Sequence, residues 1–221
     1  MKTPCSHRSG FTLIELLTVV AIMGVLLYLV TPVISSLLES NNLTFAGQTV
    51  ADELAVARQY AASRNQTVYV RFIVPTGSAY QGYTALQIWR ADPANPGNYV
   101  AVDHTTKLPT GIEISANSTL SPLVAVGNGS NDLAGSSTSA MPAGSSIAGN
   151  YVAFTVRPDG NVVAPNPPSQ AATVTNAAFM SLPYYFLTLL PVRYDASATL
   201  PKNYVTIQIN PDTANAQIFR P

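Results

Sequence analysis

One stretch near the N-terminus constrains this chain more than any other. From Phe11 to Val30 the residues are apolar, except for two threonines, one glycine and one carboxylate, Glu15. A run of about 20 apolar residues is long enough to cross a bilayer as a helix. A carboxylate inside such a run is costly and usually has a partner or a function. The stretch therefore predicts a transmembrane helix over residues 11–31 that carries one unexplained charge.

The residues before this stretch indicate its orientation. Residues 1–10 are short and polar, with positive charges on Lys2 and Arg8. Basic residues ahead of a single span favour a cytoplasmic N-terminus, which would place the rest of the chain outside. Three interpretations are open at this point. The stretch is an uncleaved anchor, a secretory signal that is cut near Ser35, or a segment that is cut before the apolar run, after Gly10. The apolar core of a secretory signal is usually shorter, at ~7–15 residues.

The residues around the start of the apolar run carry a resemblance to a known family. The segment Ser9–Leu16, with the sequence Ser-Gly-Phe-Thr-Leu-Ile-Glu-Leu, resembles the processing motif of type IV prepilins and pseudopilins. The resemblance implies that a prepilin peptidase, which is also a methyltransferase, cuts after Gly10. The new N-terminal amine of Phe11 would then be methylated. Residues 1–10 would be a leader peptide, and Glu15 would be the fifth residue of the mature chain.

The charge of Glu15 fits this interpretation. A carboxylate that is buried without a countercharge is strongly unfavourable. Cleavage after Gly10 creates a positive amine on Phe11, and the resemblance implies that Glu15 pairs with this amine in a neighbouring subunit when helices bundle. The resemblance thus implies that Gly10 and Phe11 form the leader cleavage site, that Phe11 is N-methylated and that Glu15 acts in assembly.

Helical spacing of apolar residues continues beyond the predicted span. Gaps of three or four separate the residues of one stripe, which predicts an amphipathic continuation of the helix over 32–65. The stripe consists of Leu43, Ala46, Val50, Leu54, Ala57 and Ala61. If the helix is continuous from Phe11 to Arg64, it is roughly 80 Å long. We expect Pro32 to kink it and Asn41 and Asn42 to weaken it locally.

The remainder of the chain has the pattern of short strands. Runs rich in β-branched and aromatic residues are bounded by turn residues. They lie at 67–75, 83–91, 99–102, 111–114, 151–156, 161–163, 182–190, 204–209 and 216–219. Residues 116–149 are rich in Ser, Gly and Asn and predict a long surface loop or a variable insert. The order predicts an α+β fold, in which the long helix packs on an antiparallel sheet built from 66–221 and closed by the tail.

Two further segments resemble subgroups of the same family. Asp52–Asn65, followed by a strand from Thr67, is similar to the minor pseudopilin H and FimT group, in which a helix with an Ala-Arg and Arg-Asn pattern feeds the first strand. Phe154 and the turn Arg157–Gly160 resemble that group's phenylalanine and proline-x-glycine pattern. The segment Asn42–Phe72 looks closer still to the Verru_Chthon cassette protein D group of Verrucomicrobia. These resemblances imply a pilin-like fold.

Composition and motifs argue against several other classes of protein. Lys and Arg balance Asp and Glu at 11 each, so no strong field favours nucleic acid. Cys5 is the single cysteine, which excludes a disulfide scaffold. His104 is the one histidine after residue 10, and adjacent strand residues point to opposite faces, so we do not expect Asp103 to orient it. We predict no enzyme, cofactor or metal site, with His104 a solvated loop residue.

These features predict a structural subunit. It would be a minor pseudopilin or pilin-like protein with a single span in the inner membrane and residues 66–221 in the periplasm. The resemblance implies three partners: the prepilin peptidase, other pilin or pseudopilin subunits, and an inner-membrane assembly platform. The product would be a type II secretion pseudopilus or a type IV pilus-like filament. One alternative is a membrane-tethered periplasmic module that captures DNA or a surface polymer with the 116–149 loop. A tethered periplasmic enzyme is the third.

Overall fold

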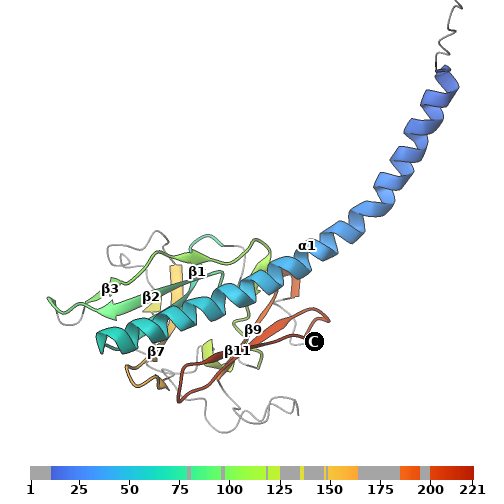
Figure 1. Ribbon diagram of the computed structural model, residues 1–221. Coiled ribbons are helices and arrows are strands. Elements are labelled where there is room, and N and C mark those ends of the chain that lie inside the picture. Colours follow the sequence, from blue (N-terminus) through green and yellow to red (C-terminus); the bar gives the residue numbers. More distant parts are fainter. Residues whose placement is uncertain are drawn as a thin grey trace, which may run out of the picture. The chain divides into compact units, whose positions relative to one another are not determined.

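The chain contains one long helix and two antiparallel sheets. A computed structural model describes residues 11–78, 81–95, 98–117, 119–124, 135–136, 147, 149–163, 185–194 and 200–221. The chain divides into two compact units, Met1–Glu39 and Ser40–Pro221. Helix α1 (Leu13–Arg64) contributes its first part to one unit and its second part to the other (Figure 1). The predicted continuous helix is therefore confirmed to within two residues at its start.

Helix α1 is continuous at the two places where sequence suggested a disturbance. The assignment runs through Pro32 and through Asn41 and Asn42, so the expected local weakening at the two asparagines is wrong. Packing of the apolar stripe begins at Leu43, and such tertiary packing outweighs a weak intrinsic propensity. The helix ends at Arg64, and the next residue, Asn65, has a left-handed backbone conformation with a φ of 48°.

The membrane span that the sequence predicts over residues 11–31 is not confirmed by the structure. In the part of the chain that the structure describes, no helix combines the length and the apolar character that crossing a membrane requires. The span over residues 11–31 therefore stays a prediction.

Eleven strands follow α1 within the described residues, and all their pairings are antiparallel. They are β1 (Val68–Pro75), β2 (Ala85–Ala91), β3 (Tyr99–Ala101), β4 (Thr106–Lys107), β5 (Ile112–Ile114), β6 (Gly135–Ser136), β7 (Gly149–Val156), β8 (Val162–Val163), β9 (Phe186–Pro191), β10 (Val205–Ile209) and β11 (Ala216–Phe219). One sheet has the order β3-β2-β1-β7-β6, with β4 paired to β2 and β8 to β7. The other has the order β11-β10-β9-β5.

The two-sheet arrangement confirms the α+β fold and changes one detail of it. We expected the C-terminal strands to close a single sheet. Instead β10 and β11 join β9 and β5 in the second sheet. Strand β9 is buried along its whole length and pairs with β10 on one side and with β5 on the other. The C-terminal strands therefore join the second sheet through β9.

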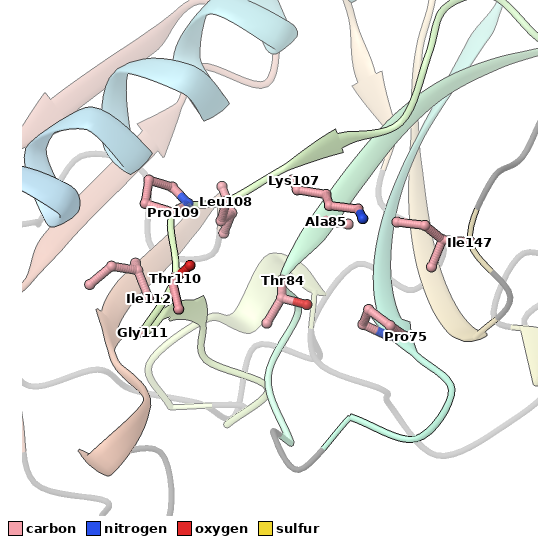
Figure 2. Close-up of a pocket in the computed structure, with 10 residues that line it drawn as sticks. All are labelled: Pro75, Thr84, Ala85, Lys107, Leu108, Pro109, Thr110, Gly111, Ile112 and Ile147. Carbon is pink, nitrogen blue, oxygen red and sulfur yellow. The ribbon is translucent and has the colours of Figure 1, made fainter.

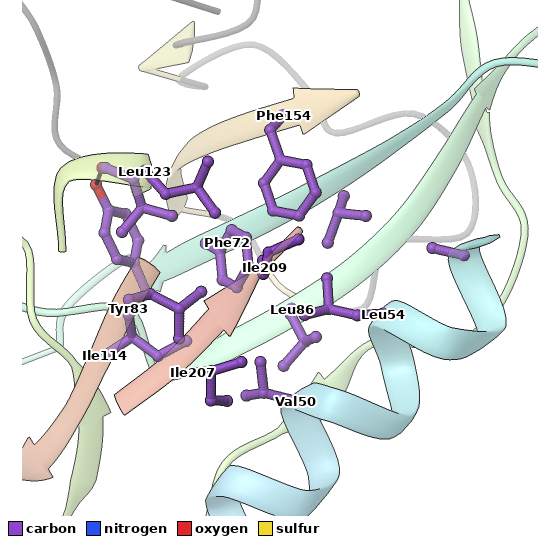
Figure 3. Close-up of a cluster of buried hydrophobic side chains, with 14 of the residues drawn as sticks. Val50, Leu54, Phe72, Tyr83, Leu86, Ile114, Leu123, Phe154, Ile207 and Ile209 are labelled. Atoms are coloured by element: carbon purple, nitrogen blue, oxygen red, sulfur yellow. Dashed lines mark hydrogen bonds between the residues drawn. The ribbon is translucent and has the colours of Figure 1, made fainter. Parts of the chain in front are cut away.

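The core lies between the second part of α1 and both sheets. Every residue of the predicted stripe is at most 2% exposed, which confirms the stripe as the packing face. Figure 3 shows Val50 and Leu54 of α1 beside Leu86 of the first sheet and Ile207 of the second. Gly47 lets the helix come close to β10, because a Cβ there would lie 3.0 Å from Cγ1 of Val205.

The C-terminal residues are tied to the same part of α1. The guanidinium of Arg220 donates hydrogen bonds to the hydroxyls of Ser40 and Thr44 on the helix. It also donates to Oδ1 of Asn203 at 3.0 Å. These contacts fix the chain end beside the first residues of the second unit.

Candidate functional site

The predicted processing site lies at the start of α1, and its geometry is that of a helix cap. Gly10 falls outside the described residues, and Phe11 is 82% exposed. The Glu15 carboxylate accepts hydrogen bonds from the backbone N–H of Thr12 at 2.8 Å and from its hydroxyl at 2.7 Å. In return, the backbone N–H of Glu15 donates to the Thr12 hydroxyl at 3.4 Å. Thr12 and Glu15 together form a capping box, which satisfies N–H groups that the first helical turn leaves free.

The capping box gives Glu15 a role within its own chain that our sequence analysis missed. The signal was present, because Thr12 and Glu15 are the first and last residues of a Thr-x-x-Glu pattern just before an apolar run. We read Glu15 only as half of an intersubunit pair. The structure does not test that pairing, which stays a prediction.

The first part of α1 presents a continuous apolar surface. All its large apolar side chains from residue 11 to residue 28 are between 45% and 82% exposed. They are Phe11, Leu13, Ile14, Leu16, Leu17, Val19, Val20, Ile22, Met23, Val25, Leu26, Leu27 and Tyr28. Exposed apolar patches of this extent mark surfaces that are covered by a membrane or by other protein chains.

The acid–histidine pair of the second unit differs from our expectation. Nδ1 of His104 lies 2.6 Å from Oδ1 of Asp103, so the two side chains do meet. Side chains of neighbouring residues alternate only in a strand, whereas Asp103 and His104 both lie in the irregular segment between β3 and β4. His104 is solvated, as predicted, with 78% of its side chain exposed. The hydrogen bond and charge of Asp103 raise the pKa of His104, and bonds from His104 lower the pKa of Asp103.

The described residues do not assemble a metal-binding cluster around this pair. No group of three or more His, Cys, Asp or Glu side chains in those ranges is close enough to hold an ion. The nearby helix is linked to this region by a different contact, in which the Thr106 hydroxyl donates to Oε1 of Glu53 at 2.5 Å. The contact fastens the segment around His104 to α1.

The predicted surface loop over 116–149 lies largely outside the described residues. Its described beginning contradicts the expectation, because residues 120–124 are buried. The Tyr83 hydroxyl donates to the carbonyl of Val124 at 2.8 Å, and the Thr188 hydroxyl donates to the carbonyl of Leu120 at 2.5 Å. This segment, which includes the 3-10 helix η1 (Pro122–Val124), therefore packs against the second sheet.

A pocket of about 270 Å³ opens beside the end of β1, at the β4–β5 connection (Figure 2). Its lining is mostly apolar, with Leu108, Pro109 and Ile112 on one side and Ile147 on another. Lys107 is the charged residue among those that line it. The lining contains no carboxylate, histidine or cysteine, so it offers no acid–base pair with Lys107.

One comparison with known protein families matches the N-terminal motif. Residues 5–29 match the family described as the prokaryotic N-terminal methylation motif. No curated protein matches the chain. Two solved structures of the minor pseudopilin EpsH, from the type 2 secretion system of Vibrio cholerae, are similar at 11% identity and a TM-score of 0.42. The similarity covers 81% and 82% of this chain and 96% of each of those chains. A likeness at this level carries no function over to this chain.

Proposed function

We propose that this chain is a pilin-like structural subunit that is cut after Gly10, methylated on Phe11 and assembled into a filament through the first part of α1. The observation that carries the proposal is the methylation-motif match over residues 5–29, which ends on a helix whose apolar side chains are exposed. Such a surface needs a cover. A membrane before assembly and neighbouring helices after it would both supply one.

The helix cap explains how one acid serves both states. After cleavage, the amine of Phe11 stands one residue before Thr12, at the positive end of the helix dipole. A positive amine there is unfavourable, and Glu15 places a negative charge in the same turn. In a filament, the amine of a neighbouring subunit would compete with Thr12 for this carboxylate. In the assembled bundle, where water is excluded, the carboxylate and the amine would thereby neutralise each other.

The location and partners of the subunit follow from the same proposal. Residues 11–31 would cross the inner membrane, and residues 66–221 would lie in the periplasm or on the assembled filament. The prepilin peptidase would cut and methylate the chain, and an inner-membrane platform would add it to other pilin or pseudopilin subunits. The filament would be a type II secretion pseudopilus or a type IV pilus-like fibre. Within this class, we propose a minor subunit of the pseudopilin H and FimT type, close to the Verru_Chthon cassette protein D group.

Assembly in cells that contain a prepilin peptidase and an assembly platform tests the proposal. Glu15→Gln keeps an oxygen acceptor for the cap but removes the charge. We expect this variant to be processed normally and to fall at least about tenfold in the sheared filament fraction, because the buried amine loses its countercharge. The matched control is Asp52→Asn, at an exposed position of the same helix. Normal incorporation of Glu15→Gln would contradict the pairing role.

A further inference from the structure

The pocket at the β4–β5 connection combines an apolar floor with an open rim (Figure 2). The floor consists of Ala85, Leu108 and Ile112, which are each at most 8% exposed. Lys107 and Thr110 line the rim and are exposed to solvent. The volume of about 270 Å³ exceeds the roughly 150 Å³ of an apolar cavity that binds benzene. The pocket is therefore large enough to take an apolar group from solution.

Backbone hydrogen bonds hold the walls of this pocket in place. The N–H of Leu108 donates to the carbonyl of Thr84 at 2.9 Å, which joins two residues of the lining. The N–H of Ile112 donates to the carbonyl of Pro109 at 3.2 Å and closes a four-residue turn. Gly111, the third residue of that turn, has the positive φ of 85° that such a turn requires. The pocket is thus formed before a ligand arrives, which lowers the cost of ordering it on binding.

The single charge in the lining is the amine of Lys107. Figure 2 shows the side chain of Lys107 extended toward Ile147, and both side chains line the pocket. Within the described part of the chain, no carboxylate lines the pocket and Lys107 forms no ion pair. A ligand that covers the amine removes part of its water, which is costly unless the ligand supplies a negative charge. The lining therefore favours a ligand that is both apolar and anionic.

We propose that this pocket binds a short apolar group that ends in a carboxylate, such as the C-terminal leucine of a peptide or a short branched fatty acid. The apolar group would contact Leu108 and Ile112, and the carboxylate would pair with Lys107. One amine balances one carboxylate and would leave a phosphate dianion in excess. None of the described lining residues is aromatic, so a nucleobase would find no ring to stack on. The site is independent of leader cleavage and of filament assembly.

A titration of the full chain in lipid nanodiscs tests the proposal. We would label the methyl groups of leucine and isoleucine, add N-acetyl-leucine at pH 7, where its carboxyl group is ionised, and follow Leu108, Ile112 and Ile147 by NMR. We expect saturable shifts of these resonances. Neutral N-acetyl-leucinamide should bind about two- to fivefold more weakly, the range that a solvent-exposed ion pair supplies. The exposed Ile218 of β11 is the control and should not follow the same curve.

Two lysine variants assign the preference to the amine of the pocket. Lys107→Met removes the charge and keeps a side chain of similar shape, so N-acetyl-leucine should then bind no more tightly than the amide. The matched control Lys202→Met, at an exposed position outside the lining, should keep the preference. An unchanged preference in Lys107→Met would contradict the assignment. Equal affinity of the unmodified chain for acid and amide, or no saturable shift up to about 20 mM, would overturn the proposal.

A third compound distinguishes the two sources of the carboxylate. 4-Methylpentanoate has the side chain and the carboxylate of leucine but lacks the peptide amide. Binding as tight as that of N-acetyl-leucine would assign the pocket to a short fatty acid. Weaker binding would assign it to a peptide end, whose amide the hydroxyls of Thr84 and Thr110 would contact. For either source, loss of tight binding in Lys107→Met but not in Lys202→Met is the result that the proposal requires.

Discussion

The carboxylate of Glu15 caps its own helix through Thr12, from which it accepts hydrogen bonds at 2.8 Å and 2.7 Å. The acid inside the apolar stretch thus has a structural function before any other subunit is present. In the proposed filament, the same carboxylate pairs with a second partner, the amine that cleavage creates on Phe11 of a neighbouring subunit.

Removal of the Thr12 hydroxyl should loosen the first turn of α1. Thr12→Ala deletes the side chain that both donates to Glu15 and accepts from its backbone N–H. Loss of a helix cap of this kind costs about 1 kcal/mol. We expect faster hydrogen exchange of the backbone amides of residues 13–16 in detergent, with Thr12→Ser as the control that retains the hydroxyl. Unchanged exchange in Thr12→Ala would show that the capping box does not hold this turn.

The buried hydroxyl of Tyr83 should make the folded body sensitive to alkali. Burial raises the pKa of Tyr83 to about 12. The folded-state pKa lies above the unfolded value of 10, so this contribution to stability is complete below pH 10. It is lost as the pH rises through 12, and a shift of this size corresponds to about 3 kcal/mol.

Tyr83→Phe provides the measurement for this contribution. Near neutral pH the variant should be less stable by about 1 kcal/mol, because the carbonyl of Val124 loses its donor. Between about pH 9 and about pH 11.5 that difference should shrink and reverse, since the wild type holds one more group whose ionisation favours unfolding than the variant does. Urea unfolding at both pH values measures the two proteins side by side. A difference that stays constant with pH would refute the raised pKa.

Glycine is required at residue 149 because backbone occupies the space for a side chain. A Cβ on Gly149 would lie 2.1 Å from the carbonyl oxygen of Val74, which precedes Pro75, the residue opposite Gly149 in the β1–β7 pair. Backbone atoms in a paired strand cannot move aside cheaply, so Gly149→Ala should destabilise the body by about 1–3 kcal/mol. Thermal unfolding measures the loss. Gly24→Ala is the control, since a Cβ there meets nothing within 4 Å, and equal stability of the two variants would contradict the account.

Local patterns predicted the parts of the fold that depend on neighbours in sequence. The spacing of the stripe from Leu43 to Ala61 identified the packing face of α1. The turn before β8 was predicted from its proline and glycine, and Gly160 has the positive φ of 86° that such a turn uses. Such features are predictable because they depend only on the spacing of apolar residues or on the residues of one turn. Both can be seen in a single sequence.

Features that depend on distant partners were not predictable in this way. The second sheet exists because β5 pairs with β9, and no local signal links Ile114 to Leu189. The rings of Trp89, Tyr99 and Tyr151, which come from β2, β3 and β7, gather around the guanidinium of Arg71 on β1. Burial of Leu123 was hidden because its segment is rich in Ser, Asn and Gly, the composition of a surface loop. The Asp103–His104 contact required a loop conformation where we had assumed a strand.

Intact-mass and N-terminal mass spectrometry of the mature protein tests the central claim most directly. The chain would be purified from membranes or filaments of cells that contain the prepilin peptidase. The account predicts an N-terminal peptide that begins at Phe11 and carries one added methyl group on its amine. A chain that retains Met1, or one that begins near Ser35, would contradict it.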